Sequence, residues 1–321
     1  MSNNILISGL VWSGSGAVVD LLREYNNINV VPGEFEDIRQ KNMIGDAIEN
    51  SLTLKELKVS KLYIKEVKFL IKVVLIMVRS VIPDKIFPFN KVMSRAQSAD
   101  ILPARVKRVV ENRRLHSALI KICKHKSRDE RIKIAKLWFS SMSDSYSNGS
   151  DFVLFDQPII HESHFNVWSE ICKPFKLIVV YREPKDQMAD ILKTASSFLF
   201  NDLPWKVDVV YGLDKNYKRI IHLLSNTTLM RMKRVDEIER TLGKQQVLVI
   251  SFEHLVEDYD KAKDTIEKFL GLKSESHTNK YNYFDPLYSK KNINHYSEYL
   301  NKYDIDELKG LSDWYNARKN S

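Results

Sequence analysis

The stretch ILISGLVWSGSGAVVDLL, residues 5–22, decides the fold because it predicts a strand, a turn and a helix in immediate succession. ILIS (5–8) is a short β-branched run typical of a buried strand, and AVVDLLREY (17–25) has the i, i+3, i+4 apolar spacing of a helix. Three glycines lie between them: Gly9, Gly14 and Gly16. Free backbone N–H groups and the positive end of the helix dipole make such a turn a candidate anion site.

The same turn lacks the residues that an ATP-binding loop requires. Gly9 and Gly14 have the separation found in G-x-x-x-x-G-K-[ST], but Ser15 and Gly16 stand where lysine and Ser/Thr belong. A magnesium-assisted kinase or ATPase is therefore disfavoured. The dinucleotide pattern G-x-G-x-x-G fails as well, because Val19 occupies the place of the third glycine. The turn predicts a phosphate site that works without a metal ion, and a purely structural tight turn is the alternative.

Further apolar runs predict the rest of a sheet. They are INVV (28–31), FVLF (152–155), KLIVVY (176–181) and QVLVIS (246–251). Continuous apolar strands separated by helical patterns indicate an α/β fold, with a central parallel sheet of about five strands flanked by helices. We expect one domain, 1–321, with a basic helical insertion at about 40–147. The serine-rich stretch 140–151 is expected to be a loop.

The insertion carries much of the positive charge. Lysines recur every three or four residues in the first half of segment 61–82, which predicts a basic amphipathic helix. Segment 101–136 holds twelve Lys or Arg against three acidic residues. Two interpretations stay open: a solvated helical face, or a patch that contacts an anionic membrane or an anionic acceptor.

Composition limits the class of protein. The net charge is +9 and the pI about 9.2, which suits a partner with phosphate, sulfate or carboxylate groups, although a solvated basic surface explains it equally well. Cys123 and Cys172 form no disulfide or zinc pattern, so a reducing compartment is expected. No signal peptide is recognisable, and the apolar run 69–78 is about half the length that spans a membrane. We expect a cytoplasmic protein.

Four stretches, in order, resemble the sulfotransferases that use 3′-phosphoadenosine 5′-phosphosulfate (PAPS). Residues 8–22 are similar to the 5′-phosphosulfate loop of that family, and residues 175–192 resemble the strand and turn that hold its 3′-phosphate. Residues 247–272 resemble its C-terminal strand and helix, and residues 288–300 are similar, more weakly, to its lysine-bearing closing loop. The resemblance implies a P-loop-type fold of the bacterial glycan-sulfotransferase kind, with PAPS as donor and no metal.

The resemblance also assigns residues to the donor. They are Trp12, Ser13, Gly14, Ser15, Gly16 and Ala17 in the loop, Arg182 and Asp190 after the fourth strand, and Lys290 and Lys291 in the closing loop. Arg182 ends a strand, where sheet ligands gather in open α/β folds, and its guanidinium suits a phosphate. A structural ion pair of Arg182 with Asp186 or Glu183 is the alternative.

Transfer to a hydroxyl requires a base, because an alcohol is a poor nucleophile while it keeps its proton. Glu34 follows the second strand, where glycan-sulfating branches of the family carry a catalytic glutamate. His161 follows the third strand, near the catalytic histidine of the cytosolic branches. Each has a structural alternative, as a helix cap for Glu34 and a satisfied histidine for His161; Asp156 is a lesser candidate.

Three residues depart from the family. Trp12 stands where a lysine or arginine contacts the sulfonate, Asp190 where a serine contacts the 3′-phosphate, and Ala17 where some branches have an aromatic residue. A carboxylate beside a phosphate is repulsive unless a cation bridges them. These departures leave the expected fold intact and leave the identity of the donor open.

We therefore expect a sulfotransferase that moves a sulfonate from PAPS to a hydroxyl of a glycan or glycolipid. Segment 61–82 would place it peripherally at the inner face of the membrane, and no nucleic-acid partner is expected. Two alternatives remain: the same scaffold with a different nucleotide donor, or an inactive protein that binds an anionic glycan or membrane surface.

Overall fold

The computed structural model describes residues 3–10, 12–35, 37–39, 42–53, 56, 101–158, 164–195 and 217–319. The membrane-contact segment 61–82 and the candidate base His161 lie outside this part of the chain. The contacts divide the chain into two compact units. We call them the sheet unit (Met1–Phe35, Tyr146–Ser163 and Pro174–Ser321) and the helical unit (Glu36–Ser145 and His164–Lys173).

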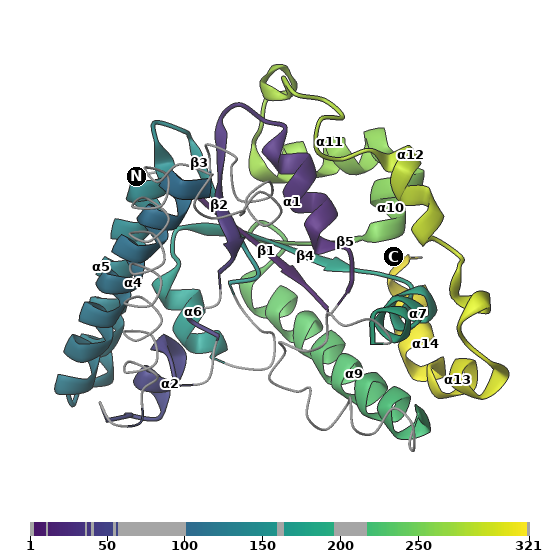
Figure 1. Cartoon of the computed structure of the whole chain (residues 1–321), viewed down its shortest axis with the longest axis horizontal. Helices are drawn as coiled ribbons and strands as arrows, with labels where there is room; N and C mark the ends of the chain where they lie inside the picture. The colour runs from purple at the N-terminus through teal and green to yellow at the C-terminus, as the bar shows by residue number, and fades with distance from the viewer. Residues whose placement is uncertain are drawn as a thin grey trace, which may run out of the picture. The chain divides into compact units, whose positions relative to one another are not determined.

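The sheet unit is built on five parallel strands (Figure 1). They are β1 (Asn3–Gly9), β2 (Ile28–Glu34), β3 (Phe152–Asp156), β4 (Phe175–Tyr181) and β5 (Val247–Ser251), in the order β2-β3-β1-β4-β5. The predicted α/β fold with a parallel five-stranded sheet is confirmed, because each predicted apolar run forms one of these strands. Buried residues fill the central strands almost continuously, as expected when helices cover both faces of a sheet.

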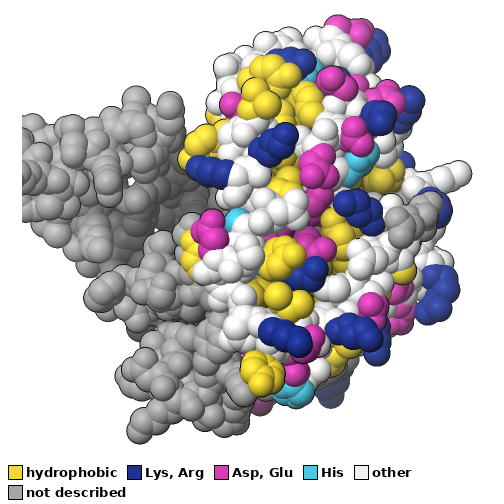
Figure 2. Space-filling view, turned by 90° about the vertical axis from the view of Figure 1, so that its right-hand side faces the viewer, with side chains coloured by type: hydrophobic (Ala, Val, Ile, Leu, Met, Phe, Trp, Pro, Cys, Tyr) yellow, Lys and Arg dark blue, Asp and Glu magenta, His cyan; other side chains and the backbone are white. Residues whose placement is uncertain are grey.

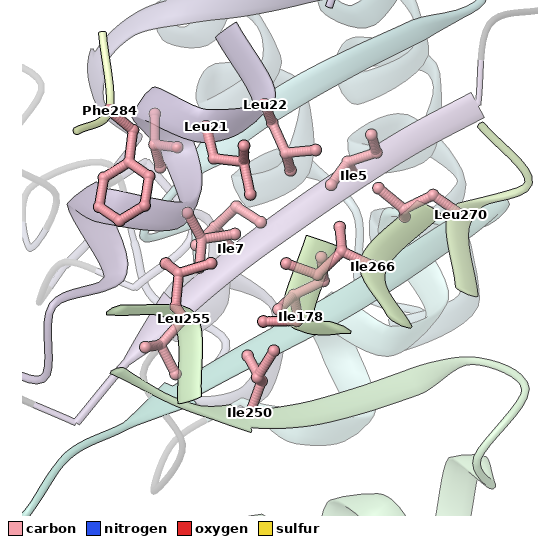
Figure 3. Packing of buried hydrophobic residues seen from close by; sticks show 14 of the residues in the cluster. Ile5, Ile7, Leu21, Leu22, Ile178, Ile250, Leu255, Ile266, Leu270 and Phe284 are labelled. Atoms are coloured by element: carbon pink, nitrogen blue, oxygen red, sulfur yellow. The ribbon is translucent and has the colours of Figure 1, made fainter. Parts of the chain in front are cut away.

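One face of the sheet packs against helices from both ends of the chain. These are α1 (Ser15–Arg23), α10 (Phe252–Glu257) and α11 (Tyr259–Leu270). Figure 3 shows the shared core: Ile5, Ile7, Ile178 and Ile250 from the strands, with Leu21, Leu22, Leu255, Ile266 and Leu270 from the helices. Full burial of one such side chain stabilises the fold by about 1.5–3 kcal/mol. The first strand and first helix are therefore held by the last third of the chain.

The remaining elements of the sheet unit follow β4 and β5. They are α7 (Pro184–Ala195), α9 (Tyr217–Leu242), η2 (Ser274–Ser276), α12 (Pro286–Ser289), η3 (Lys290–Asn292), η4 (Tyr296–Glu298), α13 (Lys302–Glu307) and α14 (Lys309–Lys319). The α9 helix contacts β5, and α14 contacts both α7 and α9. Figure 2 shows the side on which Figure 1 places α12 and α13, with Lys and Arg interspersed among Asp and Glu.

The helical unit contains α2 (Ile44–Glu49), α4 (Ile101–Lys124), most of α5 (Arg128–Ser147) and α6 (Phe165–Ile171). Its core includes Trp168, which is 1% exposed, and Arg131 donates to the Ala47 carbonyl oxygen at 3.2 Å. Among the helices that the structure describes, none has the length and apolar character to cross a membrane.

One prediction in this region is wrong. The serine-rich stretch 140–151 is mostly helix, since α5 continues to Ser147. Phe139, Met142 and Tyr146 are buried at helical spacing, so packing of this face outweighs the modest helix propensity of the intervening serines. The turn before β3 is shorter than the sequence indicated.

Candidate nucleotide site at the carboxyl edge of the sheet

All five strands run in the same direction, so their carboxyl ends lie along one edge of the sheet. The residues that end them are Gly9, Glu34, Asp156, Tyr181 and Ser251. In open α/β folds this edge is where ligands bind. The predicted phosphate loop follows β1, Arg182 follows β4, and Glu34 ends β2, so all three lie at this edge. All three belong to the sheet unit.

Two glycines of the loop are required by the protein itself. A Cβ atom at Gly9 would lie 2.5 Å from the Ser13 Oγ and 2.7 Å from the Ser15 Oγ. Gly14 has a φ of +82°, and a Cβ there would lie 2.4 Å from the Phe252 ring. Both positions therefore exclude larger side chains without any need to invoke a ligand.

Gly16 is different, because a Cβ atom added there would meet nothing within 4 Å. It is the second residue of α1, in the first turn of the helix, where N–H groups have no intrahelical acceptor. The neighbouring Ala17 packs against the core cluster, so the loop is buried on one side and open at Gly16. An anion that approaches the open side would meet the positive end of the α1 dipole.

Hydrogen bonds from the side chains of the loop and of Gln157, which directly follows β3, stabilise the conformation of the turn. The Ser13 Oγ accepts the Leu10 N–H at 3.0 Å, while Gln157 receives the Gly9 N–H at 3.3 Å and donates to the Ser15 Oγ at 2.7 Å. The hydroxyl of Ser15, which is half-buried, keeps a proton that it can donate to a phosphate, whereas Ser13 is 1% exposed. Gln157 escaped prediction; its only sequence signal is its position directly after the third strand.

Arg182 joins the end of β4 to the loop. Its Nη1 lies 3.4 Å from the Trp12 carbonyl oxygen, and its guanidinium lies over the Phe252 ring at 5.1 Å. Gln187 of α7 donates to the Leu10 carbonyl oxygen from the same side. The structure therefore brings together the two parts that the sequence assigned to opposite ends of one nucleotide.

Arg182 is nevertheless already engaged. Its side chain is 4% exposed, Nη1 donates to Asp190 Oδ2 at 2.5 Å, and Nη2 donates to the Asn292 carbonyl oxygen at 2.5 Å. The other carboxylate oxygen of Asp190 lies 3.0 Å from His295 Nε2. The ion pair expected as an alternative exists, but its partner is Asp190 rather than Asp186 or Glu183.

Asp186 instead holds the segment that was expected to close the site. Its buried carboxylate accepts the backbone N–H groups of Asn294, His295 and Tyr296 at 2.7, 2.9 and 3.0 Å. This arrangement anchors residues 290–296 against α7 and accounts for the contact between Asn292 and Arg182. A residue that the sequence marked only as a competing ion partner thus positions a whole segment.

The lysines of this segment are exposed. The Lys291 Nζ lies 3.4 Å from the centre of the Tyr288 ring, and its hydrogen bond lowers the pKa of that phenol. Lys290 and Lys291 belong to the short 3-10 helix η3, which ends at Asn292. The Asn292 carbonyl oxygen accepts a hydrogen bond from Arg182. The prediction that segment 290–292 reaches the nucleotide side is therefore compatible with its placement, and the roles of its lysines stay predictions.

Other charged groups surround Arg182. Burial raises the pKa of Glu253, whose Oε1 accepts the Glu183 N–H at 2.9 Å. Lys185 lies 3.7 Å from the Glu183 carboxylate and 4.9 Å from the Tyr296 ring centre. Lys185 thus lies between Glu183, just before α7, and Tyr296 of η4.

Glu34 and Asp156 end adjacent strands at matched register positions. The Phe35 N–H donates to the Asp156 carbonyl oxygen at 2.7 Å, and Glu34 is exposed. One strand, β3, lies between β2 and β1, and two inter-strand spacings place the Glu34 backbone roughly 10 Å from the start of the loop.

Comparison with solved structures finds a likeness to two sulfotransferases. The sulfotransferase domain of the olefin synthase from Synechococcus PCC 7002 gives a TM-score of 0.50 at 13% identity, covering 97% of this chain and 94% of that chain. The fold is sulfotransferase-like. A sulfotransferase from Alicyclobacillus acidocaldarius gives 0.43 at 13% identity, covering 98% and 96%. No family model and no curated protein matches the sequence.

Within the sulfotransferase-like fold, Trp12 takes an unusual place. It has a φ of +55° and is 36% exposed, so its indole lies at the rim of the loop and its carbonyl oxygen faces Arg182. An indole supplies one N–H donor but no charge. Among the described residues, no group of three or more His, Cys, Asp or Glu side chains is arranged to hold a metal ion.

Proposed function

We propose that this protein is a nucleotide-dependent sulfotransferase, which moves a sulfonate group from a nucleoside 5′-phosphosulfate to a hydroxyl of a glycan or glycolipid. The observation that carries the proposal is the contact between the loop and Arg182, 3.4 Å at Trp12, at the carboxyl edge of a parallel sheet. The sulfotransferase-like fold and the ordered sequence resemblances support the choice of sulfonate over phosphoryl transfer.

The proposed reaction needs positioning, charge stabilisation and one proton acceptor. The acceptor oxygen forms a bond to sulfur while the bond from sulfur to the bridging phosphate oxygen breaks, and that electron pair stays on the nucleotide phosphate. The first-turn N–H groups of α1 and the hydroxyls of Ser13 and Ser15 would bind the phosphate on which negative charge develops. Such preorganised donors act without moving during the reaction.

Glu34 is the proposed base among the described residues. It would take the proton that the acceptor hydroxyl loses as its oxygen attacks sulfur. Its position at the end of β2, two strands from β1, fits an acceptor that approaches from the far side of the donor phosphate. His161 stays a second proposal for the same role.

The two ends of PAPS fit the site unequally. The 5′ end fits, because the loop is open at Gly16, where a Cβ atom would meet nothing, and lies at a helix N-terminus. The 3′ end fits poorly, because Arg182, which would bind the 3′-phosphate, already donates hydrogen bonds to Asp190 and to the Asn292 carbonyl oxygen. We therefore propose the 5′-phosphosulfate as the common feature of the donor and derive no step from a 3′-phosphate.

The acceptor class is proposed from charge. A protein of net charge +9 with a strongly basic segment at 101–136 suits an anionic glycan or a lipid-linked precursor. Segment 61–82, by its basic amphipathic pattern, is proposed to contact the anionic inner face of a membrane. Liposome sedimentation with anionic lipid tests this contact, since salt should reduce the pelleted fraction.

Sulfonate transfer is tested with donors that carry radioactive sulfur. The protein is incubated with adenosine 5′-phosphosulfate or PAPS and a panel of oligosaccharides and glycolipids with free hydroxyls, and labelled product is counted. We expect transfer from at least one donor, and a loss of about 10²-fold or more in kcat for Glu34→Gln. The exposed Glu275→Gln serves as the matched control and should retain activity. Nucleotide binding without product across the panel would contradict the enzyme proposal and favour the inactive binding protein.

A further inference from the structure

We infer that the nucleotide site accepts a ribose with a free 3′-hydroxyl, and that Asp190 occupies the place that a 3′-phosphate would take. This inference rests on the proposed function, because it assumes that a nucleotide 5′-phosphate binds at the loop. It assigns Asp190 as the residue that determines donor specificity. The donor class would then be a nucleoside 5′-phosphosulfate whose ribose carries no phosphate.

The first step is the state of Arg182. Both terminal nitrogens already donate to protein acceptors, with Nη1 shared between Asp190 and the Trp12 carbonyl oxygen and Nη2 bound to Asn292. The face of the guanidinium lies over the Phe252 ring. A planar guanidinium binds phosphate through the same fork of N–H groups, so a 3′-phosphate would have to displace these partners.

The second step is how firmly those partners are held. Asn292 belongs to the segment that Asp186 anchors through three backbone hydrogen bonds. Asp190 is held from the other side by His295, whose Nδ1 also lies 3.3 Å from Asp186. A phosphate that displaced Asp190 from Arg182 would have to break a 2.5 Å charge-assisted hydrogen bond to a guanidinium that is 4% exposed.

The third step concerns charge. The carboxylates of Asp190 and Glu253 lie near Arg182, and the Glu183 carboxylate lies 3.7 Å from Lys185. A doubly charged phosphate placed beside Asp190 would meet a like charge, and the Arg182 guanidinium that pairs with this charge is already engaged. A neutral ribose hydroxyl meets no such repulsion.

The fourth step is what Asp190 can offer. Its side chain is 22% exposed, so solvent and ligands reach it although it is paired. A carboxylate has about four lone-pair sites, and the contacts to Arg182 and His295 leave room for a further hydrogen bond. Acidic side chains bind unphosphorylated ribose hydroxyls in dinucleotide sites, whereas arginine accommodates the phosphorylated form. In this protein the charge of Arg182 is neutralised by Asp190, and the Asp190 carboxylate stays accessible.

Calorimetry with two defined nucleotides tests the inference. The probes are AMP and adenosine 3′,5′-bisphosphate, which share the base and the 5′-phosphate and differ only at the 3′ position. The unaltered protein should bind AMP as tightly as the bisphosphate or more tightly. Asp190→Ser should raise the affinity for the bisphosphate relative to AMP by about tenfold or more, because it removes the like charge and frees Arg182.

Two further variants test whether the charge of Asp190 causes the shift in affinity. Asp190→Asn keeps the size of the side chain and an oxygen for Arg182 while it removes the charge, and should shift the ratio in the same direction. Asp264→Ser removes an exposed carboxylate of α11 and should leave the ratio unchanged. A thermal unfolding curve for each variant shows whether it is folded.

The outcomes separate this inference from the proposed function. If the unaltered protein binds the bisphosphate about tenfold more tightly than AMP, the inference is wrong and the sulfotransferase proposal stands. If neither nucleotide binds, both are wrong. If AMP is preferred but both Asp190 variants keep that preference, Asp190 does not determine it and the assignment fails.

Discussion

At the scale of single residues, the glycines of the loop divide into two kinds. Gly14 is required by its own backbone, with a φ of +82° and the Phe252 ring where a Cβ would lie. Gly16 is not required by any protein contact, since a Cβ there meets nothing within 4 Å. The difference separates what the fold needs from what a ligand would need.

We predict opposite effects on stability for the two alanine variants. Gly14→Ala should lower the free energy of unfolding by about 2–4 kcal/mol, because it combines left-handed strain with an aromatic clash. Gly16→Ala should raise it by about 0.5–1 kcal/mol, since alanine favours a helix over glycine. Urea unfolding measures both.

Nucleotide binding completes this prediction. Gly16→Ala should weaken AMP binding by about tenfold or more despite its added stability, because the new methyl group enters the open side of the loop. Unchanged affinity in this stable variant would show that the phosphate does not approach the loop at Gly16.

At the scale of elements, two buried carboxylates position the C-terminal segment of the sheet unit. Glu24, at the end of α1, accepts the N–H groups of Tyr283 and Phe284, each at 3.0 Å. Asp186, in the first turn of α7, accepts three N–H groups of residues 294–296. These backbone N–H groups lie outside the regular hydrogen bonds of helices and sheets. The two carboxylates supply the acceptors that buried N–H groups require.

The anchor at Asp186 can be tested by its removal. Asp186→Ala should cost about 2–4 kcal/mol of folding free energy, because buried N–H groups lose their acceptor. The amides of Asn294, His295 and Tyr296 should exchange faster with solvent than in the unaltered protein, as measured by hydrogen exchange with mass spectrometry. This change should be confined largely to residues 290–299.

Asp285→Ala is the matched control. Its exposed side chain accepts only the Leu287 N–H, at 2.8 Å, at the start of a four-residue helix. Its loss should cost about 0.5–1 kcal/mol and leave the amides at 294–296 protected. If exchange at those amides is the same in Asp186→Ala as in the control, the anchoring role is refuted.

At the scale of the whole molecule, the chain forms two compact units with separate contact sets. The loop, Arg182, Asp190 and Glu34 all belong to the sheet unit, so the proposed nucleotide site lies within that unit. The net charge of +9 is not gathered into one patch on the face in Figure 2, where basic and acidic side chains are interspersed.

A nucleotide should therefore stabilise the two units unequally. At AMP concentrations of about 100 times Kd, the sheet unit gains about 2.7 kcal/mol against unfolding. Hydrogen exchange should slow in α1 and α7, and amides of α5 in the helical unit should change less. Equal slowing in α5 and α1 would contradict a site built within the sheet unit alone.

Local patterns predicted much of the architecture. The β-branched runs forecast all five strands, because a strand buried on both faces must be apolar along its whole length. The loop between β1 and α1 followed from its glycines, and Arg182 from its place at a strand end. The same method misjudged α5, because it weighed the serines between 140 and 147 above Met142 and Tyr146, which continue the buried face.

Local sequence patterns did not predict which residues pair with Arg182 and with the loop. The sequence offered Glu183 and Asp186 as partners for Arg182, and the structure selects Asp190, one turn farther along α7. It also brings Asn292 to the same guanidinium and Gln157 to the loop, across more than a hundred residues of chain in each case. No periodic pattern marks such contacts, because they depend on how elements pack.

The sequence by itself determined the strands, the glycine-rich turn after the first strand and the sign of the net charge, since each depends on neighbouring residues alone. Only the tertiary structure decided that Arg182 is paired with Asp190 and contacted by a segment that Asp186 anchors. The physical reason is that a charge takes the partner that packing places within hydrogen-bond distance, however far apart the two are in the chain.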